Sequence, residues 1–232
     1  MSVTTKWIDI KGDDGTFGAY LAVPHTGKGP GIVLLQEIFG VNEHIRSVAE
    51  QYAADGFVVL VPDLFWRQGA RIELGYDEAS MPRAYELYQS IDFAKTMADI
   101  TLTAKTLRAL PEVEGKIASV GYCFGGLLSY NMAADGSVDM AVGYYGGGIQ
   151  NQLDKADSIT VPLQLHFGDA DSHIPNDAVA AIAAKLEDKD NVEIHVYPGA
   201  DHGFNCSHRG SYHLQASVHA HGNTLVFLSE NL

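Results

Sequence analysis

The chain has 232 residues, of which 46% are apolar, and its 29 acidic against 15 basic side chains give a net charge of −14. This length and composition can supply a full hydrophobic core, which excludes global disorder. The acidic balance argues against nucleic acid as a partner, and no apolar run approaches the ~18 residues of a membrane span. We expect a single cytoplasmic domain over residues 1–232, with both cysteines free and no membrane partner. The sequence does not determine the oligomeric state, and a monomer is the default.

Short apolar runs and longer amphipathic stretches alternate along the chain. Trp7–Ile10 and Phe17–Val23 flank the turn sequence GDDG, which predicts a hairpin at a sheet edge. Later runs rich in Val, Ile and Leu are continuous, as in strands buried on both faces of a parallel sheet. These predicted strands cover residues 31–37, 57–63, 116–123, 140–146, 162–168 and 192–199.

Helices are predicted between these runs. They cover Asn42–Asp55, a pair within Ala84–Leu110, Gly126–Ala134, Asn176–Glu187 and Tyr212–Leu228. The alternation predicts an α/β fold with a mostly parallel central sheet, helices on both faces and functional residues beyond the carboxyl ends of the strands. The stretch Leu64–Pro82 fits neither pattern, and we interpret it as a lid or pocket rim or as a plain surface loop.

A nucleophile motif lies where one apolar run meets a predicted helix. Gly121, Cys123 and Gly125 form G-x-C-x-G, the nucleophile-elbow pattern with cysteine in place of serine. The glycines suit a sharp turn in which neighbouring backbone comes close. The helix that follows points its N-terminal end at the thiol, which favours thiolate and offers N–H groups to a developing oxyanion.

An acid and a histidine are expected downstream of the nucleophile, in that order. The loop after residues 162–168 holds Asp169 and Asp171, of which we prefer Asp171. The loop after the last predicted strand, with the sequence ADHGF, holds His202. We therefore predict that Cys123 is the nucleophile, that His202 is its base and that Asp171 orients His202.

Nearly the whole chain resembles the dienelactone hydrolases (carboxymethylenebutenolidases), a family with the α/β-hydrolase fold. The resemblance rests on QEIFGVN at 36–42, PDL at 62–64, GYCFGG at 121–126, AVGYYG at 141–146, the G-x-x-D-x-x-I-P loop at 168–175 and A-x-H-x-F at 200–204. It implies a small ester or lactone as substrate and no cofactor. It also implies that Glu37 accepts the thiol proton in the resting enzyme and that the N–H groups of Ile38 and Phe124 form the oxyanion hole.

Two positions depart from the family's pattern. Arginines near the family's pocket hold the carboxylate of the lactone, and their apparent positions here are Met81 and Cys206. The net charge repels anions at long range, so a carboxylated substrate would need local cations. Arg83 and Arg209 are the candidates for this role.

Tyrosines are candidates for lining the pocket. Tyr85, on a predicted helix, could face the substrate or the core, and either Tyr144 or Tyr145 could face the substrate, with Tyr144 preferred. The sequence YYGGG at 144–148 lacks the following Gly-Lys-Ser/Thr of a phosphate loop, and no G-x-G-x-x-G occurs. We interpret this stretch as a strand end at the pocket wall.

The predicted reaction is hydrolysis of a dienelactone-type lactone through an acyl-enzyme on a Cys-His-Asp triad. The main alternative is a general carboxylesterase or thioesterase with the same triad. A thiol-based redox protein using Cys206, a catalytically inactive binding module and a metal site are further alternatives. The histidines near the end of the chain match no H-E-x-x-H pattern, so we expect solvated helix histidines and no metal: His208, His213, His219 and His221.

Overall fold

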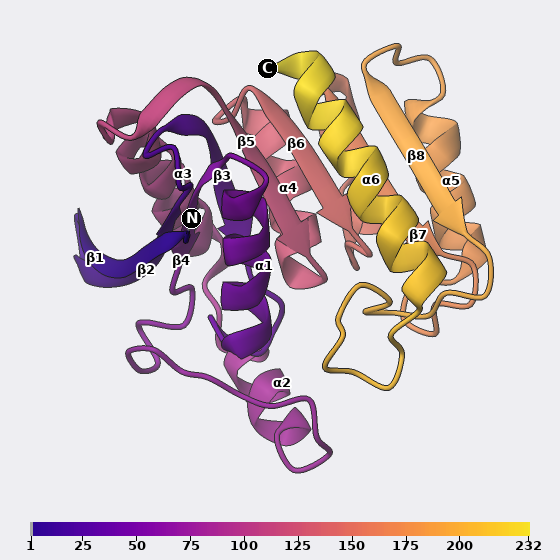
Figure 1. Ribbon diagram of the computed structural model, residues 1–232. Coiled ribbons are helices and arrows are strands. Elements are labelled where there is room, and N and C mark those ends of the chain that lie inside the picture. Colours follow the sequence, from indigo (N-terminus) through magenta and orange to yellow (C-terminus); the bar gives the residue numbers. More distant parts are fainter. Residues whose placement is uncertain (1) are drawn as a thin grey trace. The chain divides into compact units, whose positions relative to one another are not determined.

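The structure is a computed structural model that describes residues 2–232 (Figure 1). The chain forms two compact units, which meet in sequence between Ile117 and Ala118. Each unit is described by itself below. The expectation of a single domain over residues 1–232 stays a prediction.

The strands of the first unit lie in the order β1-β2-β4-β3. β1 (Thr4–Gly12) and β2 (Gly15–Val23) form the expected antiparallel hairpin, with β1 at the edge. β2 pairs antiparallel with β4 (Val58–Pro62), which pairs parallel with β3 (Gly29–Leu35). Every residue of β4 is buried, as expected for an apolar run covered on both faces.

Two helices of the first unit cover these strands. α1 (Glu43–Ala54) packs on β2 and β4, and α3 (Phe93–Ala109) packs on β1, β3 and β4. Figure 1 shows α1 in front of the strands and the fainter α3 behind them. α2 (Met81–Gln89) is separated from α3 by residues 90–92, so the predicted helix pair is confirmed. Side chains cap both long helices, since Asn42 accepts from the backbone of α1 and Asp92 from that of α3.

The irregular stretch Leu64–Pro82 is hydrogen-bonded to the rest of the first unit at several points. The N–H of Arg71 donates to Asp63 Oδ2 at 2.6 Å, and the N–H of Leu74 donates to the carbonyl of Phe39 at 2.9 Å. The side chain of Asn42 donates to the carbonyl of Leu74 at 3.1 Å. The stretch therefore follows the loop after β3, and its last two residues begin α2.

The strands of the second unit lie in the order β5-β6-β7-β8 and all run parallel. They are β5 (Val113–Tyr122, which starts in the first unit), β6 (Met140–Tyr144), β7 (Leu163–Gly168) and β8 (Val192–Tyr197). The helices are α4 (Phe124–Asp135), α5 (Asn176–Leu186) and α6 (Leu214–Asn231), with short 3-10 helices at Ile149–Asn151 and Leu153–Ser158. α6 crosses in front of β6 and β7 in Figure 1.

Parallel strands bring their carboxyl ends to one edge, and the predicted triad follows three of these ends. Cys123 comes directly after β5, Asp171 after β7 and His202 after β8. One histidine expected to be solvated has a structural task instead: His213 caps α6, its Nδ1 accepting from the N–H of Ala216 at 3.2 Å.

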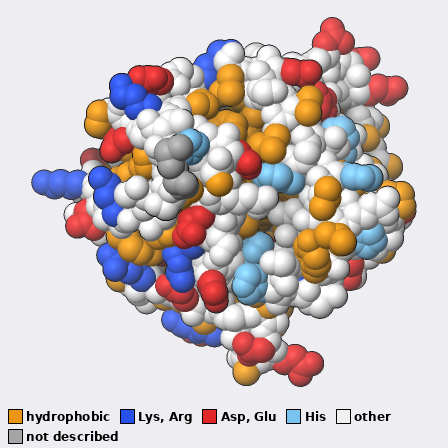
Figure 2. Space-filling model, in the orientation of Figure 1, with side chains coloured by type: hydrophobic (Ala, Val, Ile, Leu, Met, Phe, Trp, Pro, Cys, Tyr) orange, Lys and Arg blue, Asp and Glu red, His pale blue; other side chains and the backbone are white. Residues whose placement is uncertain are grey.

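Charged side chains on the face in Figure 2 are mixed, with blue basic groups beside red acidic ones. In the first unit, Arg46 pairs with Glu73 at 2.6 Å, and Arg67 pairs with both Asp14 and Asp99. Among residues 2–232, no helix is long and apolar enough to cross a bilayer.

Candidate active site

Cys123 occupies a strained turn between β5 and α4. Its φ of +55° and ψ of −113° lie outside the regions that L-residues ordinarily adopt. Strain of this kind costs on the order of 1–3 kcal/mol and persists where the surroundings impose it. The N–H of Cys123 donates to the carbonyl of Tyr144 at 3.0 Å, which ties the turn to the end of β6.

Two glycines permit this turn because side chains there would meet backbone. A Cβ on Gly121 would lie 1.9 Å from the carbonyl oxygen of Gly125. A Cβ on Gly126 would lie 2.6 Å from the carbonyl oxygen of Tyr144. Any larger residue would push α4 away from β5 or β6, so close backbone approach explains the glycines at positions 121 and 126.

His202 and Asp171 form a buried pair. The Nδ1 of His202 lies 2.9 Å from Oδ2 of Asp171, and their side chains are only 7% and 1% exposed. The other oxygen, Oδ1, accepts the N–H groups of His173 at 2.7 Å and Ile174 at 2.9 Å. Asp171 is therefore fixed by its own loop, and it directs Nδ1 of His202, which leaves Nε2 for the reaction.

The electrostatics of His202 couple it to Cys123. Burial by itself lowers the pKa of His202, but the negative charge of the Cys123 sulfur and the hydrogen bonds to Asp171 and Cys123 raise that pKa to about 10. An imidazolium beside a thiolate is the charge arrangement of an activated cysteine nucleophile. The second unit thus brings together all three residues of the predicted triad.

Aromatic rings enclose His202. The ring of Tyr145 meets it edge to face with centroids 5.2 Å apart, and the ring of His173 does so at 4.8 Å. Tyr145 has a φ of +37°, one residue beyond the end of β6. Burial and the charge of His202 lower the pKa of His173, so that ring is neutral near pH 7.

The sequence matches one protein family over most of its length. The model of the dienelactone hydrolase family matches residues 17–232. This chain belongs to that family. It is 36% identical to a carboxymethylenebutenolidase of Pseudomonas sp. (strain P51), over 95% of this chain and 92% of that protein. Membership makes the protein a hydrolase of carboxylic esters.

Solved structures agree on the fold. A dienelactone hydrolase-like promiscuous phosphotriesterase from metagenomic libraries superposes with a TM-score of 0.85 at 23% identity, covering 100% of this chain and 99% of that one. The alpha/beta hydrolase GrgF from Penicillium sp. sh18 does so with a TM-score of 0.73 at 14% identity, covering 98% and 99%. The predicted α/β-hydrolase fold is confirmed.

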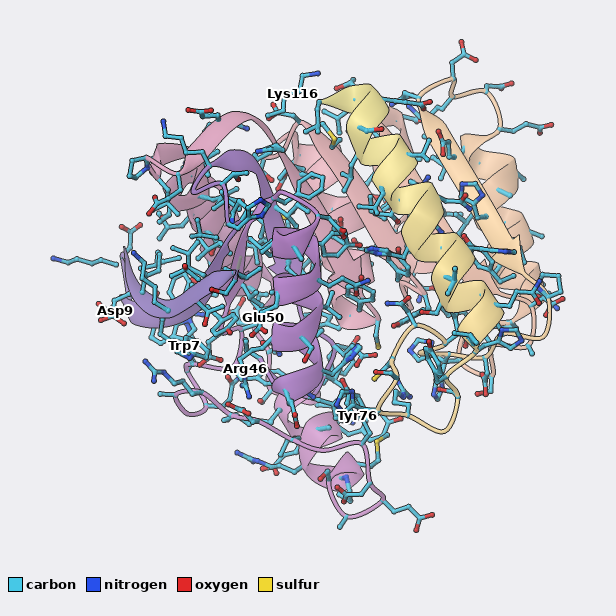
Figure 3. The ribbon with its side chains drawn as sticks, in the orientation of Figure 1. Trp7, Asp9, Arg46, Glu50, Tyr76 and Lys116 are labelled. Atoms are coloured by element: carbon cyan, nitrogen blue, oxygen red, sulfur yellow. The ribbon has the colours of Figure 1, made fainter. Side chains whose placement is uncertain are left out.

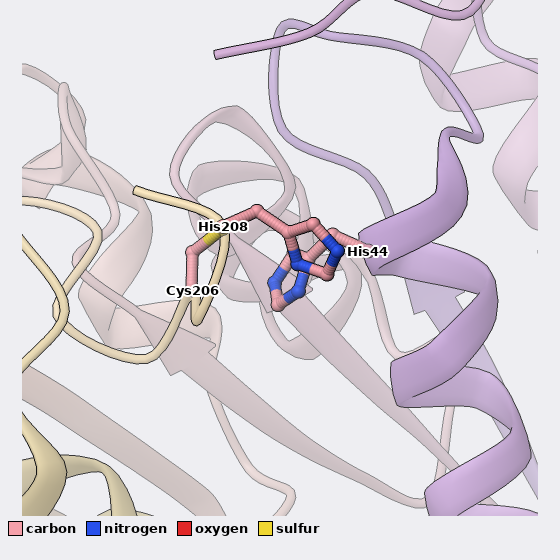
Figure 4. A group of neighbouring side chains, drawn as sticks. All are labelled: His44, Cys206 and His208. Carbon is pink, nitrogen blue, oxygen red and sulfur yellow. The ribbon is translucent and has the colours of Figure 1, made fainter. Parts of the chain in front are cut away.

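The residues at the family's arginine positions differ in their surroundings. Cys206 is fully buried, and its sulfur lies within 4.8 Å of a ring nitrogen of His208 on the same loop (Figure 4). Within residues 2–232 both cysteines are free thiols. Met81 is the first residue of α2.

The two candidate arginines have different settings. A Cβ on Gly203 would lie 2.5 Å from Nη1 of Arg209, so this guanidinium covers the backbone next to His202. Arg83 Nη1 instead pairs with Glu86 at 2.7 Å on an exposed stretch of α2. Of the two, Arg209 lies next to His202, and the role of each arginine toward a substrate carboxylate stays a prediction.

The tyrosine candidates differ in what their side chains contact. Tyr144 is fully buried, and its hydroxyl lies 2.7 Å from Oγ1 of Thr224 on α6. Tyr145, which sequence reasoning ranked second, is the one whose ring meets His202. The substrate contacts expected of Tyr144 and of Tyr85, which is 42% exposed on α2, stay predictions.

Glu37 and Ile38 lie in the first unit, two and three residues after the end of β3. Both are buried, and the carboxylate of Glu37 accepts a hydrogen bond at 2.7 Å from the hydroxyl of Tyr76. Sequence reasoning missed Tyr76 and His173. Tyr76 lies in an irregular stretch without periodicity, while His173 could have been found from its place two residues after Asp171.

Proposed function

We propose that the protein opens a small dienelactone-type lactone through an acyl-enzyme on Cys123, with His202 as proton carrier and Asp171 as its orienter. The observation that carries this proposal is the buried His202–Asp171 pair, whose imidazole is coupled to the sulfur of a strained strand-to-helix turn. The names of relatives, among them carboxymethylenebutenolidases, support the substrate class.

The first half of the reaction uses the charged pair. The Cys123 thiolate attacks the lactone carbonyl, a C–S bond forms, and the carbonyl oxygen takes the negative charge. Phe124 begins α4, where N–H groups lack partners within the helix, so its N–H is the proposed donor to that oxygen together with the N–H of Ile38. The ring C–O bond then breaks, and Nε2–H of His202 protonates the departing oxygen.

The second half uses the neutral imidazole. In the thioester the sulfur carries no charge, so the largest influence that raises the pKa of His202 is gone. Neutral His202 then takes a proton from water as the water attacks the thioester, and the C–S bond breaks to release the ring-opened acid. The proton on His202 and the thiolate together restore the starting pair.

A general carboxylesterase or thioesterase with the same triad is the second candidate. It is favoured by the replacement of the family's arginines by Met81 and by the buried Cys206. Such a pocket would bind uncharged esters as well as or better than carboxylated lactones. Arg209, lying over Gly203, favours the first candidate.

Steady-state hydrolysis of a carboxylated dienelactone, an uncharged aryl ester and an acyl thioester separates these candidates. The measurement is repeated after alkylation with iodoacetamide in a Cys206→Ser background, where Cys123 is the remaining thiol. We expect preference for the lactone and loss of all turnover on alkylation. Turnover of the aryl ester or thioester alone would support the second candidate, and turnover that survives alkylation would overturn both.

A further inference from the structure

α6 exposes an apolar stripe along one face. Of the eight large apolar side chains that are exposed in the described part of the chain, five lie between Tyr212 and Leu232. Three of them belong to α6 itself, where Leu214, Val218 and Val226 are 66%, 58% and 56% exposed. Orange side chains lie along this helix in Figure 2. A contiguous apolar surface of this kind marks an interaction site.

The other face of α6 is buried against the sheet. Its buried residues are Ala216, Ala220, Thr224, Phe227 and Leu228. A surface helix usually turns charged residues to solvent, whereas a helix that is apolar on all sides is typical of a covered position. Among its 18 residues α6 has one Asp, Glu, Lys or Arg side chain, Glu230. α1, by contrast, carries Glu43, Arg46 and Glu50, and Figure 3 labels the last two.

Gly222 lies at the centre of the stripe. It follows Val218 by four residues and precedes Val226 by four, so the three residues share one row on the helix surface. A glycine inside a helix makes that helix less stable than alanine would. A Cβ on Gly222 would meet nothing within 4 Å, and its φ is not positive. Nothing in the described part of the chain therefore requires glycine here, but the close approach of another backbone would require it.

We propose that α6 is the interface of a symmetric dimer, in which α6 of a second copy crosses it at Gly222. The absence of side chains at the crossing point lets the two helices approach closely, and Val218 and Val226 of each copy pack on either side of that point. A two-fold axis brings the same surface of both copies together. A row that is apolar on both sides of Gly222 is complementary to itself in this way.

The charge of the protein favours this face for self-association. Each copy has a net charge of −14, so two copies repel each other at long range and acidic faces cannot come together without cost. On α6 the one carboxylate, Glu230, lies eight residues beyond Gly222, which is about 12 Å along the helix axis. The same lack of charge offers no ion pairs to a charged partner protein. The face is therefore better suited to a second copy than to a basic or acidic partner.

The size of the stripe predicts weak association. α6 is about 27 Å long, and two crossing faces of this length would bury roughly 500 Å² of each copy. This area is at the lower end of specific interfaces, where complexes form and dissociate readily. We therefore expect a dissociation constant on the order of 10 µM, so that the protein is a monomer when dilute and a dimer when concentrated.

Sedimentation velocity over about 1 to 200 µM tests the dimer. The wild-type protein should pass from monomer to dimer across this range. Val218→Lys should raise the dissociation constant at least about tenfold, because it places a charge in the apolar contact. Val196→Lys on β8, at a position that is 47% exposed, makes the same substitution elsewhere and should leave the dissociation constant unchanged. A wild-type monomer at every concentration, or equal effects of the two variants, would overturn the inference.

Gly222→Ala should change folding and association in opposite directions. Alanine favours the helix and meets nothing within one copy, so the melting temperature of the dilute monomer should rise by a few degrees. In the dimer each copy then adds a methyl group at the crossing point, so the dissociation constant should rise about tenfold. Gly210→Ala, at another glycine whose Cβ would meet nothing within 4 Å, should leave association unchanged. A Gly222→Ala protein that dimerises like the wild type would overturn the inference.

A lipid surface is the other occupant that an exposed apolar helix face can have. Helices that lie on membranes are usually rich in Lys and Arg on their polar face, and α6 contains neither residue. Flotation with phosphatidylcholine vesicles should therefore leave the wild-type protein unbound. Binding of the monomer to these vesicles that Val218→Lys abolishes would assign the face to lipid and overturn the inference.

Discussion

The Nδ1 of His202 and the Oδ2 of Asp171 lie 2.9 Å apart in a setting from which solvent is almost fully excluded. Two backbone N–H groups of its own loop donate to Asp171, so the carboxylate that orients the imidazole is itself fixed in position. The pKa of His202 nevertheless depends most strongly, among the influences that raise it, on the charge of Cys123. His202 and Cys123 therefore form an electrostatically coupled pair, and in the proposed reaction the charge state of this pair changes when the sulfur is acylated.

This coupling can be measured on His202 directly. Replacing Cys123 by Ser removes the thiolate charge, so the pKa of His202 should fall below its value of about 10 in the wild-type protein. NMR titration of the imidazole resonances measures the change. Cys206→Ser is the matched control and should leave the titration of His202 unchanged, whereas an unchanged pKa in Cys123→Ser would show that the two side chains are uncoupled.

The pH dependence of kcat/KM follows from the same pair. In the proposed reaction, protonated His202 supplies the proton for the leaving oxygen, and its raised pKa keeps it protonated far above the ordinary 6.5 of histidine. We expect no alkaline loss of kcat/KM between pH 6.5 and 9, followed by a fall as pH rises through about 10. Circular dichroism at each pH controls for unfolding, and an alkaline limb centred near pH 7 would contradict the assignment.

Gly121 should be intolerant of the smallest side chain. An Ala Cβ there would lie 1.9 Å from the carbonyl oxygen of Gly125. Because this oxygen belongs to the backbone, it cannot move aside without a large cost in free energy. Gly121→Ala is expected to lower the free energy of unfolding by about 3 kcal/mol, as measured by urea denaturation. Gly210→Ala, where a Cβ would meet nothing within 4 Å, should be close to neutral, and equal stability of both variants would disprove the close approach.

Arg209 should matter only for charged substrates. If its guanidinium holds a substrate carboxylate beside His202, Arg209→Gln should raise KM for a carboxylated dienelactone about tenfold and leave an uncharged aryl ester unaffected. Arg83→Gln is the control, because Arg83 is already paired with Glu86 on an exposed face. The reverse pattern would assign the carboxylate to Arg83.

Much of the site could be predicted because its residues lie at strand ends that the sequence marks plainly. Cys123 follows a continuous apolar run between glycines, and Asp171 and His202 follow later runs in the order that the fold requires. The hairpin of β1 and β2 could be predicted as well, because two strand-like runs flank a turn sequence.

The remaining features depend on backbone geometry and long-range contact. Tyr144 and Tyr145 are neighbours, and which one meets His202 is decided by the left-handed backbone of Tyr145 just past the end of β6. Tyr76 is 39 residues from Glu37 in sequence. An irregular stretch has no periodic pattern from which the side chain that contacts this carboxylate could be predicted. His213 caps α6 because the helix begins at the next residue. Helix ends cannot be predicted from sequence to within one or two residues, so this role could not be predicted.

The most direct test of the account is the hydrolysis of a carboxylated dienelactone by Cys123→Ala. The fold should survive, since alanine fills less space at a position that already tolerates a positive φ. With no sulfur to form the acyl-enzyme, kcat/KM should fall by roughly 10³-fold or more. Turnover close to that of the wild-type protein would contradict a reaction that passes through Cys123.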